Sequence, residues 1–201
     1  MTVTENNNKI ISLRYEWEEA KRKDRAMKNI LIVVDMQKDF VDGALGTKEA
    51  VAIVDKVVTK IKDFDGDIIA TYDTHGENYM DTQEGKKLPV PHCIKQTEGW
   101  RLDKKIQAVL DEKGFTEVYK PTFGSVDLVE IIRKYDVANT QIQLIGLCTD
   151  ICVVSNALLL KASFPEMNIS VDAACCAGVT PEKHLAALET MSSCQIEVLN
   201  S

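Results

Sequence analysis

Two cysteines in the stretch GLCTDICVV, residues 146–154, lie one helical turn apart and directly follow the apolar run QIQLI. A thiol in the first turn of a helix is close to unpaired backbone N–H groups and to the positive end of the helix dipole, and a neighbouring ammonium lowers its pKa further. The spacing therefore predicts that Cys152 is a thiolate nucleophile, with Cys148 close by. Thr149 is a candidate N-cap, and Asp150 suits a first turn, so neither needs a catalytic role.

Two charged residues could complete the chemistry of such a thiol. Asp35 ends the strand-like run NILIVVD, and Lys120 ends the strand-like run TEVYK. Because the carboxyl ends of parallel strands meet at one edge of a sheet, we expect both side chains to lie near Cys152. A carboxylate in that position can act as the general base that activates the thiol.

Other uses of these cysteines remain open. A buried cysteine often acts only as a small hydrophobic side chain. Cys148 and Cys152 have a spacing that zinc accepts, but Cys175 and Cys176 are adjacent and make a poor second pair of ligands. A cysteine–histidine pair is a further alternative. Two of the three histidines fit a metal site better, and His184 lies in an amphipathic helix where surface exposure is expected.

A second group of polar residues lies in the segment YDTHGENYMDTQEGKKLPVPHCI. Asp73 and His75 follow another strand-like run, and His92 comes after a stretch stiffened by proline. Two imidazoles and nearby carboxylates suit a divalent transition metal. The alternative is a polar surface loop without a ligand.

The elements that must position these residues alternate along the chain. Strand-like runs occupy residues 29–35, 66–73, 116–120, 141–147, 168–174 and 195–200, and helical patterns occupy residues 51–64, 100–114, 127–136, 150–164 and 181–191. Six strands with helical crossovers predict an α/β fold with a doubly wound, mainly parallel sheet in three layers. We expect one domain over 28–201, preceded by a leader at 1–27 with helical i,i+4 charge pairs. The long loop at 74–99 is expected to carry function.

Composition narrows the classes of partner. The chain has 201 residues, of which 45% are hydrophobic, and a formal net charge of −7, with one dense basic run, KRKDR, at 21–25. These values argue against a nucleic-acid partner. The absence of an apolar run of about 20 residues and the polar start of the chain argue against a membrane span or a secretory signal. We expect a cytoplasmic protein whose six cysteines are reduced thiols.

Taken together, four motifs resemble the nicotinamidase and isochorismatase-like cysteine hydrolases over Lys28 to Ser201. The motifs are LIVVDMQKDF, VYKPTFGS, GLCTDICV and CAGVTPEKHLAALETM. The resemblance implies a catalytic triad in which Asp35 takes the proton of the Cys152 thiol and Lys120 holds both charges in place. It also implies a cis peptide before Cys148, whose backbone N–H would form an oxyanion hole with that of Cys152.

The same resemblance implies a bound Zn, Mn or Fe ion. Its ligands would be Asp73, His75 and His92, with Glu84 in the region where many relatives have a third histidine. Glu77 is the fallback for this fourth ligand.

The resemblance also bears on the substrate. Phe40 and Phe123 are the candidates for contact with a substrate ring. Relatives tend to have an aromatic residue just before the second histidine, whereas this chain has Leu-Pro-Val-Pro at 88–91. This difference argues against nicotinamide as the preferred substrate but not against hydrolysis.

The activity implied is that of a metal-containing amidase that converts nicotinamide and water to nicotinate and ammonia through a thioester. A metal-free relative that hydrolyses a carbamoyl, ureido or vinyl-ether substrate is the nearest alternative. A non-catalytic redox sensor is a second alternative, but a sensor needs no base such as Asp35. We also expect a homo-oligomer, since closed symmetric assemblies are common.

Overall fold

A computed structural model describes residues 27–201, so the predicted leader, apart from Met27, lies outside the described residues. Within the described part of the chain, no helix is both long enough and apolar enough to cross a membrane.

Six strands form one sheet in the order β3-β2-β1-β4-β5-β6, and every neighbouring pair is parallel. Their bounds are β1 Lys28–Val34, β2 Asp67–Asp73, β3 Thr116–Lys120, β4 Thr140–Leu147, β5 Asn168–Ala177 and β6 Glu197–Leu199. The strand order reverses between β1 and β4, which is where doubly wound sheets place their ligands. The predicted fold class is therefore confirmed.

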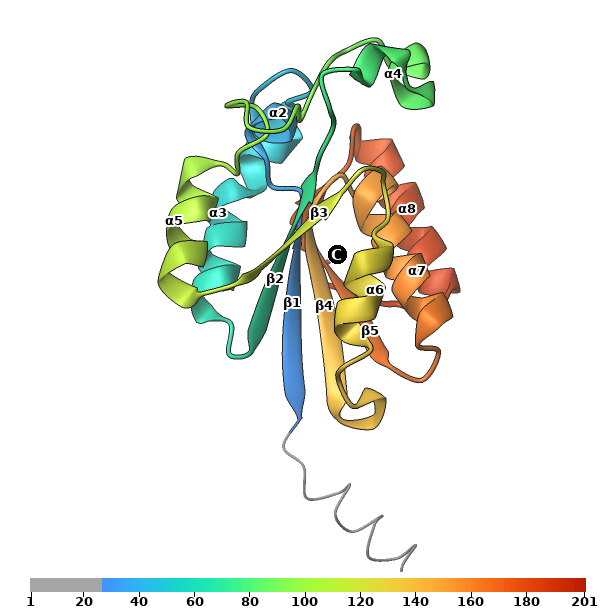
Figure 1. The fold of residues 1–201 in the computed structure, drawn as a ribbon. Helices are drawn as coiled ribbons and strands as arrows, with labels where there is room; N and C mark the ends of the chain where they lie inside the picture. The colour runs from blue at the N-terminus through green and yellow to red at the C-terminus, as the bar shows by residue number, and fades with distance from the viewer. Residues whose placement is uncertain (1–26) are drawn as a thin grey trace, which may run out of the picture.

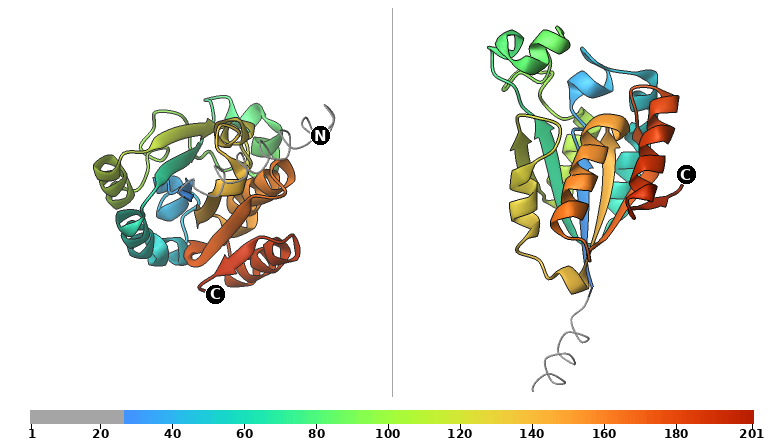
Figure 2. Two further views of the ribbon diagram at one scale, coloured as in Figure 1. Left: turned by 90° about the horizontal axis from the view of Figure 1, so that it is seen from below. Right: turned by 90° about the vertical axis from the view of Figure 1, so that its right-hand side faces the viewer.

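Helices cover both faces of the sheet (Figure 1). One face carries α3 (Lys48–Asp63) and α5 (Lys104–Lys113), and the other carries α6 (Val126–Ile132), α7 (Val154–Ser163) and α8 (Pro181–Ser193). The short helices are α2 (Lys38–Val41), α4 (Gln83–Lys87), the 3-10 turns η1 (Tyr79–Asp81) and η2 (Val137–Asn139), and the π-helical turn η3 (Thr149–Val153). Figure 2 shows that α4 projects beyond the carboxyl ends of the strands.

The central strand β1 is buried on both sides, which explains its continuous apolar sequence. Leu31 and Val33 pack into the core beneath α3 and α5. Ile30, Ile32 and Val34 pack into the core beneath α6, α7 and α8. The end of β1 is thereby held rigidly in the middle of the sheet.

Several element bounds differ from the predicted ones because of side-chain caps. α3 begins at Lys48 because Thr47 accepts a hydrogen bond from Ala50 N, and α5 begins only after Asp103, whose side chain caps its first turn. The predicted loop at 74–99 contains η1 and α4, and the helix predicted at 150–164 starts as the π-helical turn.

Gly146 brings β4 unusually close to β1 near the carboxyl edge. Its φ angle is +115°, and a Cβ atom there would lie 2.2 Å from Val34 O. Only glycine fits this position without strain. The peptide between Leu147 and Cys148, one residue further on, is cis as expected.

Candidate active site

The three residues predicted as a catalytic triad lie together at the carboxyl edge of the sheet. Lys120 Nζ is 2.7 Å from Asp35 Oδ2 and 3.5 Å from Cys152 Sγ. Asp35 and Lys120 are completely buried, and Cys152 is 4% exposed. The lysine therefore forms a bridge between the carboxylate and the thiol.

Asp35 is oriented by the neighbouring strand β2. It follows β1 directly with a φ of 45°, and its backbone N–H donates to Thr71 O at 3.2 Å. The Thr71 hydroxyl donates to Asp35 Oδ1 at 2.6 Å, which leaves Oδ2 for Lys120. Thr71 was not singled out from the sequence, where it is one position within an apolar strand.

Burial dominates the electrostatics of the triad. It raises the pKa of the Cys152 thiol well above its usual value, and the nearby Asp35 charge adds to the increase. Burial also raises the pKa of Asp35, although Lys120 opposes that effect. For Lys120, burial alone would lower the pKa, but Asp35, Cys152 and Asp73 raise it. Burial thus acts on the Cys152 thiol in the direction opposite to the lowered pKa expected from its helix position, while the Lys120 charge acts in the expected direction.

The helix that carries Cys152 also differs from the prediction. Cys152 lies in η3, the π-helical turn, rather than in the first turn of an α-helix. Cys148 stands at the N-cap position without a side-chain cap, so the N-cap predicted for Thr149 is wrong. Thr149 Oγ1 instead forms a 2.8 Å hydrogen bond with His184 Nδ1. The prediction that His184 is exposed is also wrong, because its side chain is partly buried.

The two cysteines of this segment do not form a metal site. Cys148 packs against the core on the α3 side, whereas Cys152 packs into the core on the α7 side. In the same way, Cys175 packs into the core on the α3 side and Cys176 packs into the core on the α7 side. All six cysteines are free thiols.

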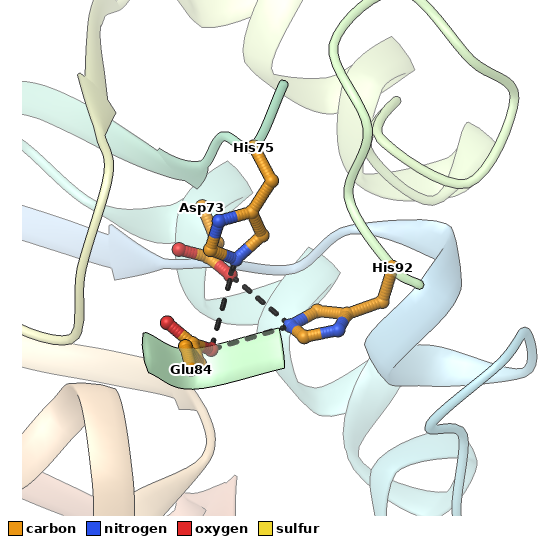
Figure 3. A group of neighbouring side chains, drawn as sticks. All are labelled: Asp73, His75, Glu84 and His92. Atoms are coloured by element: carbon orange, nitrogen blue, oxygen red, sulfur yellow. Dashed lines mark hydrogen bonds and ion pairs between the residues drawn. The ribbon is translucent and has the colours of Figure 1, made fainter. Parts of the chain in front are cut away.

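The predicted metal ligands come together in one group (Figure 3), and one of them, Asp73, contacts Lys120 of the triad. One ligand atom from each of four residues lies within 4.8 Å of every other, the residues being Asp73, His75, Glu84 and His92. His75 Nε2 is 2.9 Å from Asp73 Oδ2 and 3.7 Å from Glu84 Oε1. His92 Nε2 is 3.5 Å and 3.8 Å from the same two oxygens. The fallback ligand Glu77 is exposed and is not part of this group.

The loop that carries these ligands is held by its own residues. His92 Nδ1 lies 2.8 Å from Val90 O, which leaves Nε2 facing the cluster. The buried ring of Tyr79 packs 4.8 Å from the His75 ring and 5.0 Å from the His92 ring, measured between centroids. A Cβ atom on Gly85 would lie 2.1 Å from Tyr79 O, so this glycine lets α4 pack closely and place Glu84.

Asp73 joins the ligand group to the triad. Lys120 Nζ lies 3.4 Å from Asp73 Oδ1. The buried Gln37 side chain donates to Asp73 O at 2.8 Å and accepts from Asp73 N at 2.7 Å. Burial alone would raise the pKa of Asp73, but hydrogen bonds from His75 and His92 and the Lys120 charge hold it below its usual value. Gln37 was another residue missed in the sequence, although it lies in the strand-end motif.

Of the two predicted substrate contacts, Phe40 lies beside the ligand group, with its ring centroid 5.5 Å from that of His92. Phe123 is 43% exposed in the loop between β3 and α6. The buried Asn156 side chain donates to Phe123 O at 3.1 Å and to Cys152 O at 2.8 Å. Its Oδ1 accepts from Ser125 N at 3.0 Å, so it fixes the Phe123 loop against the cysteine turn.

Comparison with known proteins identifies the family of this chain. The isochorismatase domain model matches residues 29–201. The uncharacterized isochorismatase family protein PncA of Bacillus subtilis (strain 168) is 31% identical over 145 residues, which cover 66% of this chain and 78% of the relative.

Two solved structures are similar over most of the chain. The nicotinamidase/pyrazinamidase PncA of Bacillus subtilis has a TM-score of 0.77 at 26% identity and covers 87% of this chain and 100% of its own. The pyrazinamidase of Pyrococcus horikoshii, solved in complex with zinc, has a TM-score of 0.69 at 26% identity, and the match covers 87% of this chain and 99% of the pyrazinamidase. Since the domain model matches nearly all the described residues, this chain belongs to the isochorismatase family.

Proposed function

We propose that the protein hydrolyses the carboxamide of nicotinamide or a related small heteroaromatic amide through a thioester on Cys152. That the chain is an amide-hydrolysing enzyme follows from its similarity to solved nicotinamidases and pyrazinamidases. The observation that carries the substrate class is the position of Lys120 Nζ, which lies 3.5 Å from Cys152 Sγ and 3.4 Å from Asp73 in the ligand group. The nucleophile and a site for a donor atom of the substrate are thus adjacent.

In the first half of the reaction, Asp35 accepts the thiol proton while Cys152 Sγ bonds to the amide carbon. The carbonyl π electrons move to the oxygen, which the N–H groups of Cys148 and Cys152 stabilise. When the carbonyl re-forms, the C–N bond breaks and the proton on Asp35 passes to the leaving nitrogen. Ammonia departs and a thioester remains.

In the second half, water replaces ammonia. Asp35 takes a proton from the water as its oxygen attacks the thioester carbon. Collapse of this second intermediate breaks the C–S bond, and the proton returns from Asp35 to Cys152. Lys120 stays protonated throughout and compensates the charge that moves between the carboxylate and the sulfur.

The ligand group fits a divalent transition metal. Two imidazoles and two carboxylates are typical ligands of such ions, and ligand distances of about 2.1 Å imply ligand–ligand separations of about 3 to 3.5 Å. The separations of 2.9 to 3.8 Å between His75 or His92 and the carboxylates are close to that range. When bound, the ion would supply a Lewis-acid position that accepts a ring nitrogen and orients the carboxamide.

Protein purified without a histidine tag is expected to contain close to one Zn, Mn or Fe ion per chain by elemental analysis. Replacing a ligand, as in His92→Ala or Glu84→Gln, should lower the affinity for the ion by about tenfold or more, because changes to the partners of metal ligands already cost that much. Glu77→Gln is the matched control, because this loop carboxylate is exposed and outside the group. Metal-free protein that stays fully active in a chelator would contradict this assignment.

The ring nitrogen gives a test of substrate orientation. Nicotinamide and benzamide share a ring and a carboxamide, but benzamide lacks the donor nitrogen. We expect kcat/KM to be about tenfold or more higher for nicotinamide, a difference of about 1.4 kcal/mol in transition-state binding. Equal values for the two amides would show that the ligand group does not orient the substrate.

The Leu-Pro-Val-Pro segment at 88–91 supports a second candidate, an isochorismatase-like hydrolase of a carbamoyl, ureido or vinyl-ether compound. Leu88 is 37% exposed, and the segment has no aromatic residue to pack on a substrate ring just before His92. Loss of a stacked ring costs about 1 kcal/mol beyond area burial and should raise KM more than it lowers kcat. Turnover of a carbamoyl compound, with none of either aromatic amide, would favour this second candidate.

A further inference from the structure

The cysteine turn is tied to α8 and the loop before it by two hydrogen bonds. Thr149 Oγ1 bonds His184 Nδ1 at 2.8 Å, and Val179 N donates to Asp150 Oδ1 at 2.9 Å. The loop can approach this closely because of Gly178, where a Cβ atom would lie 2.8 Å from both Asp150 Oδ1 and His184 N. Both residues that follow Cys148 are therefore fixed from outside their own helix.

The first of these bonds is sheltered from solvent. Thr149 is completely buried, and His184 is partly buried on the first turns of α8. Burial lowers the pKa of His184, which favours the neutral ring, and a neutral imidazole can accept from or donate to the threonine hydroxyl according to its tautomer. A buried hydroxyl left without its partner would cost free energy, so the pair holds Thr149 in one orientation.

We propose that His184 is a positioning residue that acts through Thr149 to hold the backbone N–H groups of Cys148 and Cys152 in place around the reacting carbonyl. This proposal rests on the proposed function, because it assigns a role in the same reaction. Thr149 lies between the two N–H groups in the chain, so a shift of this residue displaces both. Displacements of about 1 Å at such donors are enough to lower a rate about 100-fold.

His184 is not a candidate for the general base itself. Its Nδ1 is used by Thr149, and the ionised groups beside Cys152 Sγ are Asp35 and Lys120. The contact that joins the histidine to the cysteine turn is its bond with Thr149 Oγ1, so it acts through that residue.

The test uses the full chain with His184→Ala, Thr149→Val, the double variant and the conservative variant His184→Asn. We expect His184→Ala to lower kcat for nicotinamide by about 10- to 100-fold, somewhat less than the loss of a whole oxyanion donor, with KM changed less than about twofold. The kcat of the double variant should be no lower than that of the less active single variant, because each single substitution already removes the same hydrogen bond. His184→Asn should recover most of kcat, since its amide can occupy the position of Nδ1.

Pyridine-3-carbaldehyde provides a readout that does not depend on amide turnover. Cys152 Sγ bonds to its carbonyl carbon, the thiol proton passes through Asp35 to the oxygen, and the adduct is a hemithioacetal whose oxygen occupies the oxyanion position. His184→Ala should lower the affinity for this aldehyde by the same factor by which it lowers kcat. Binding of nicotinate, which forms no such adduct, should not change.

Leu185→Ala is the matched control, because Leu185 is the next residue on α8 and is 64% exposed. It should leave kcat and aldehyde affinity unchanged. Equal effects of His184→Ala and Leu185→Ala, a loss confined to KM, or no recovery in His184→Asn would overturn the proposal. Wild-type protein that binds the aldehyde but does not hydrolyse nicotinamide would overturn only the proposed function, and the aldehyde affinities would still decide the role of His184. If the wild-type protein forms no adduct on Cys152, the positioning role is overturned as well.

Discussion

Replacement of Cys152 by alanine, or of Asp35 by asparagine, is expected to lower kcat/KM for nicotinamide by about 1,000-fold or more while the fold persists. Covalent catalysis fails without the nucleophile, and the buried thiol stays protonated without the carboxylate that accepts its proton. Steady-state ammonia release measures the loss, and circular dichroism together with thermal unfolding checks the fold. Asparagine keeps the shape of Asp35 and can still accept the hydrogen bond from Thr71.

Cys148→Ala is the comparison variant for Cys152→Ala. Only the main-chain N–H of Cys148 would take part in the reaction, so we expect this variant to lose less than about tenfold in kcat/KM. Equal inactivation of the two cysteine variants would contradict the division of roles between side chain and backbone. Appreciable turnover by Cys152→Ala or Asp35→Asn would contradict the mechanism itself.

Replacement of Lys120 by methionine should both inactivate the protein and destabilise it by about 3 to 5 kcal/mol, as expected when one partner of a buried ion pair is removed. Lys120 is fully buried and lies 2.7 Å from Asp35 and 3.4 Å from Asp73, so its loss leaves two buried carboxylates without their cation. Chemical denaturation at pH 7 measures the change in the free energy of unfolding. Lys104→Met, at an exposed position of α5, is the control and should change stability by less than about 0.5 kcal/mol.

The destabilisation of the Lys120 variant should also depend on pH. Burial already raises the pKa of Asp35, and loss of the lysine charge removes the main effect that opposes it. A carboxyl group whose folded pKa lies above its unfolded pKa carries its penalty at high pH and loses it as the pH falls through the folded value. The variant should therefore approach the wild type in stability on acidification, and a deficit that stays constant from pH 8 to pH 5 would contradict this account.

The strand-end residues could be predicted from the sequence because their positions depend on one rule of parallel sheets. Asp35 ends an apolar run and Lys120 ends the short strand-like run TEVYK, and both runs must end at the same edge. The ligands Asp73, His75 and His92 were recognisable from residue type and local spacing. Glu84 could be predicted as a ligand only from the resemblance to the family, because the length of the loop does not fix which of its residues reaches the other ligands.

The remaining features depend on contacts between segments that the sequence does not relate. The hydrogen bonds of Thr149 with His184 and of Asn156 with Phe123 each join elements more than thirty residues apart. Local helix position indicates a low pKa for Cys152, whereas burial and the nearby Asp35 charge both act to raise it. Such a balance is set by the packed environment and cannot be read from neighbours in the chain.

The two halves of the site differ in how they are built along the chain. The metal ligands all lie between residues 73 and 92, where Asp73 ends strand β2 and the other three follow in the connection to α5. The triad residues are spread from 35 to 152 and are held by three different strands and their connections. Surface segments tolerate insertion and replacement, whereas the buried sheet does not. A change in the segment that carries His75, Glu84 and His92 would therefore alter the metal site alone, whereas a change at Asp73 would also remove a contact of Lys120 in the triad.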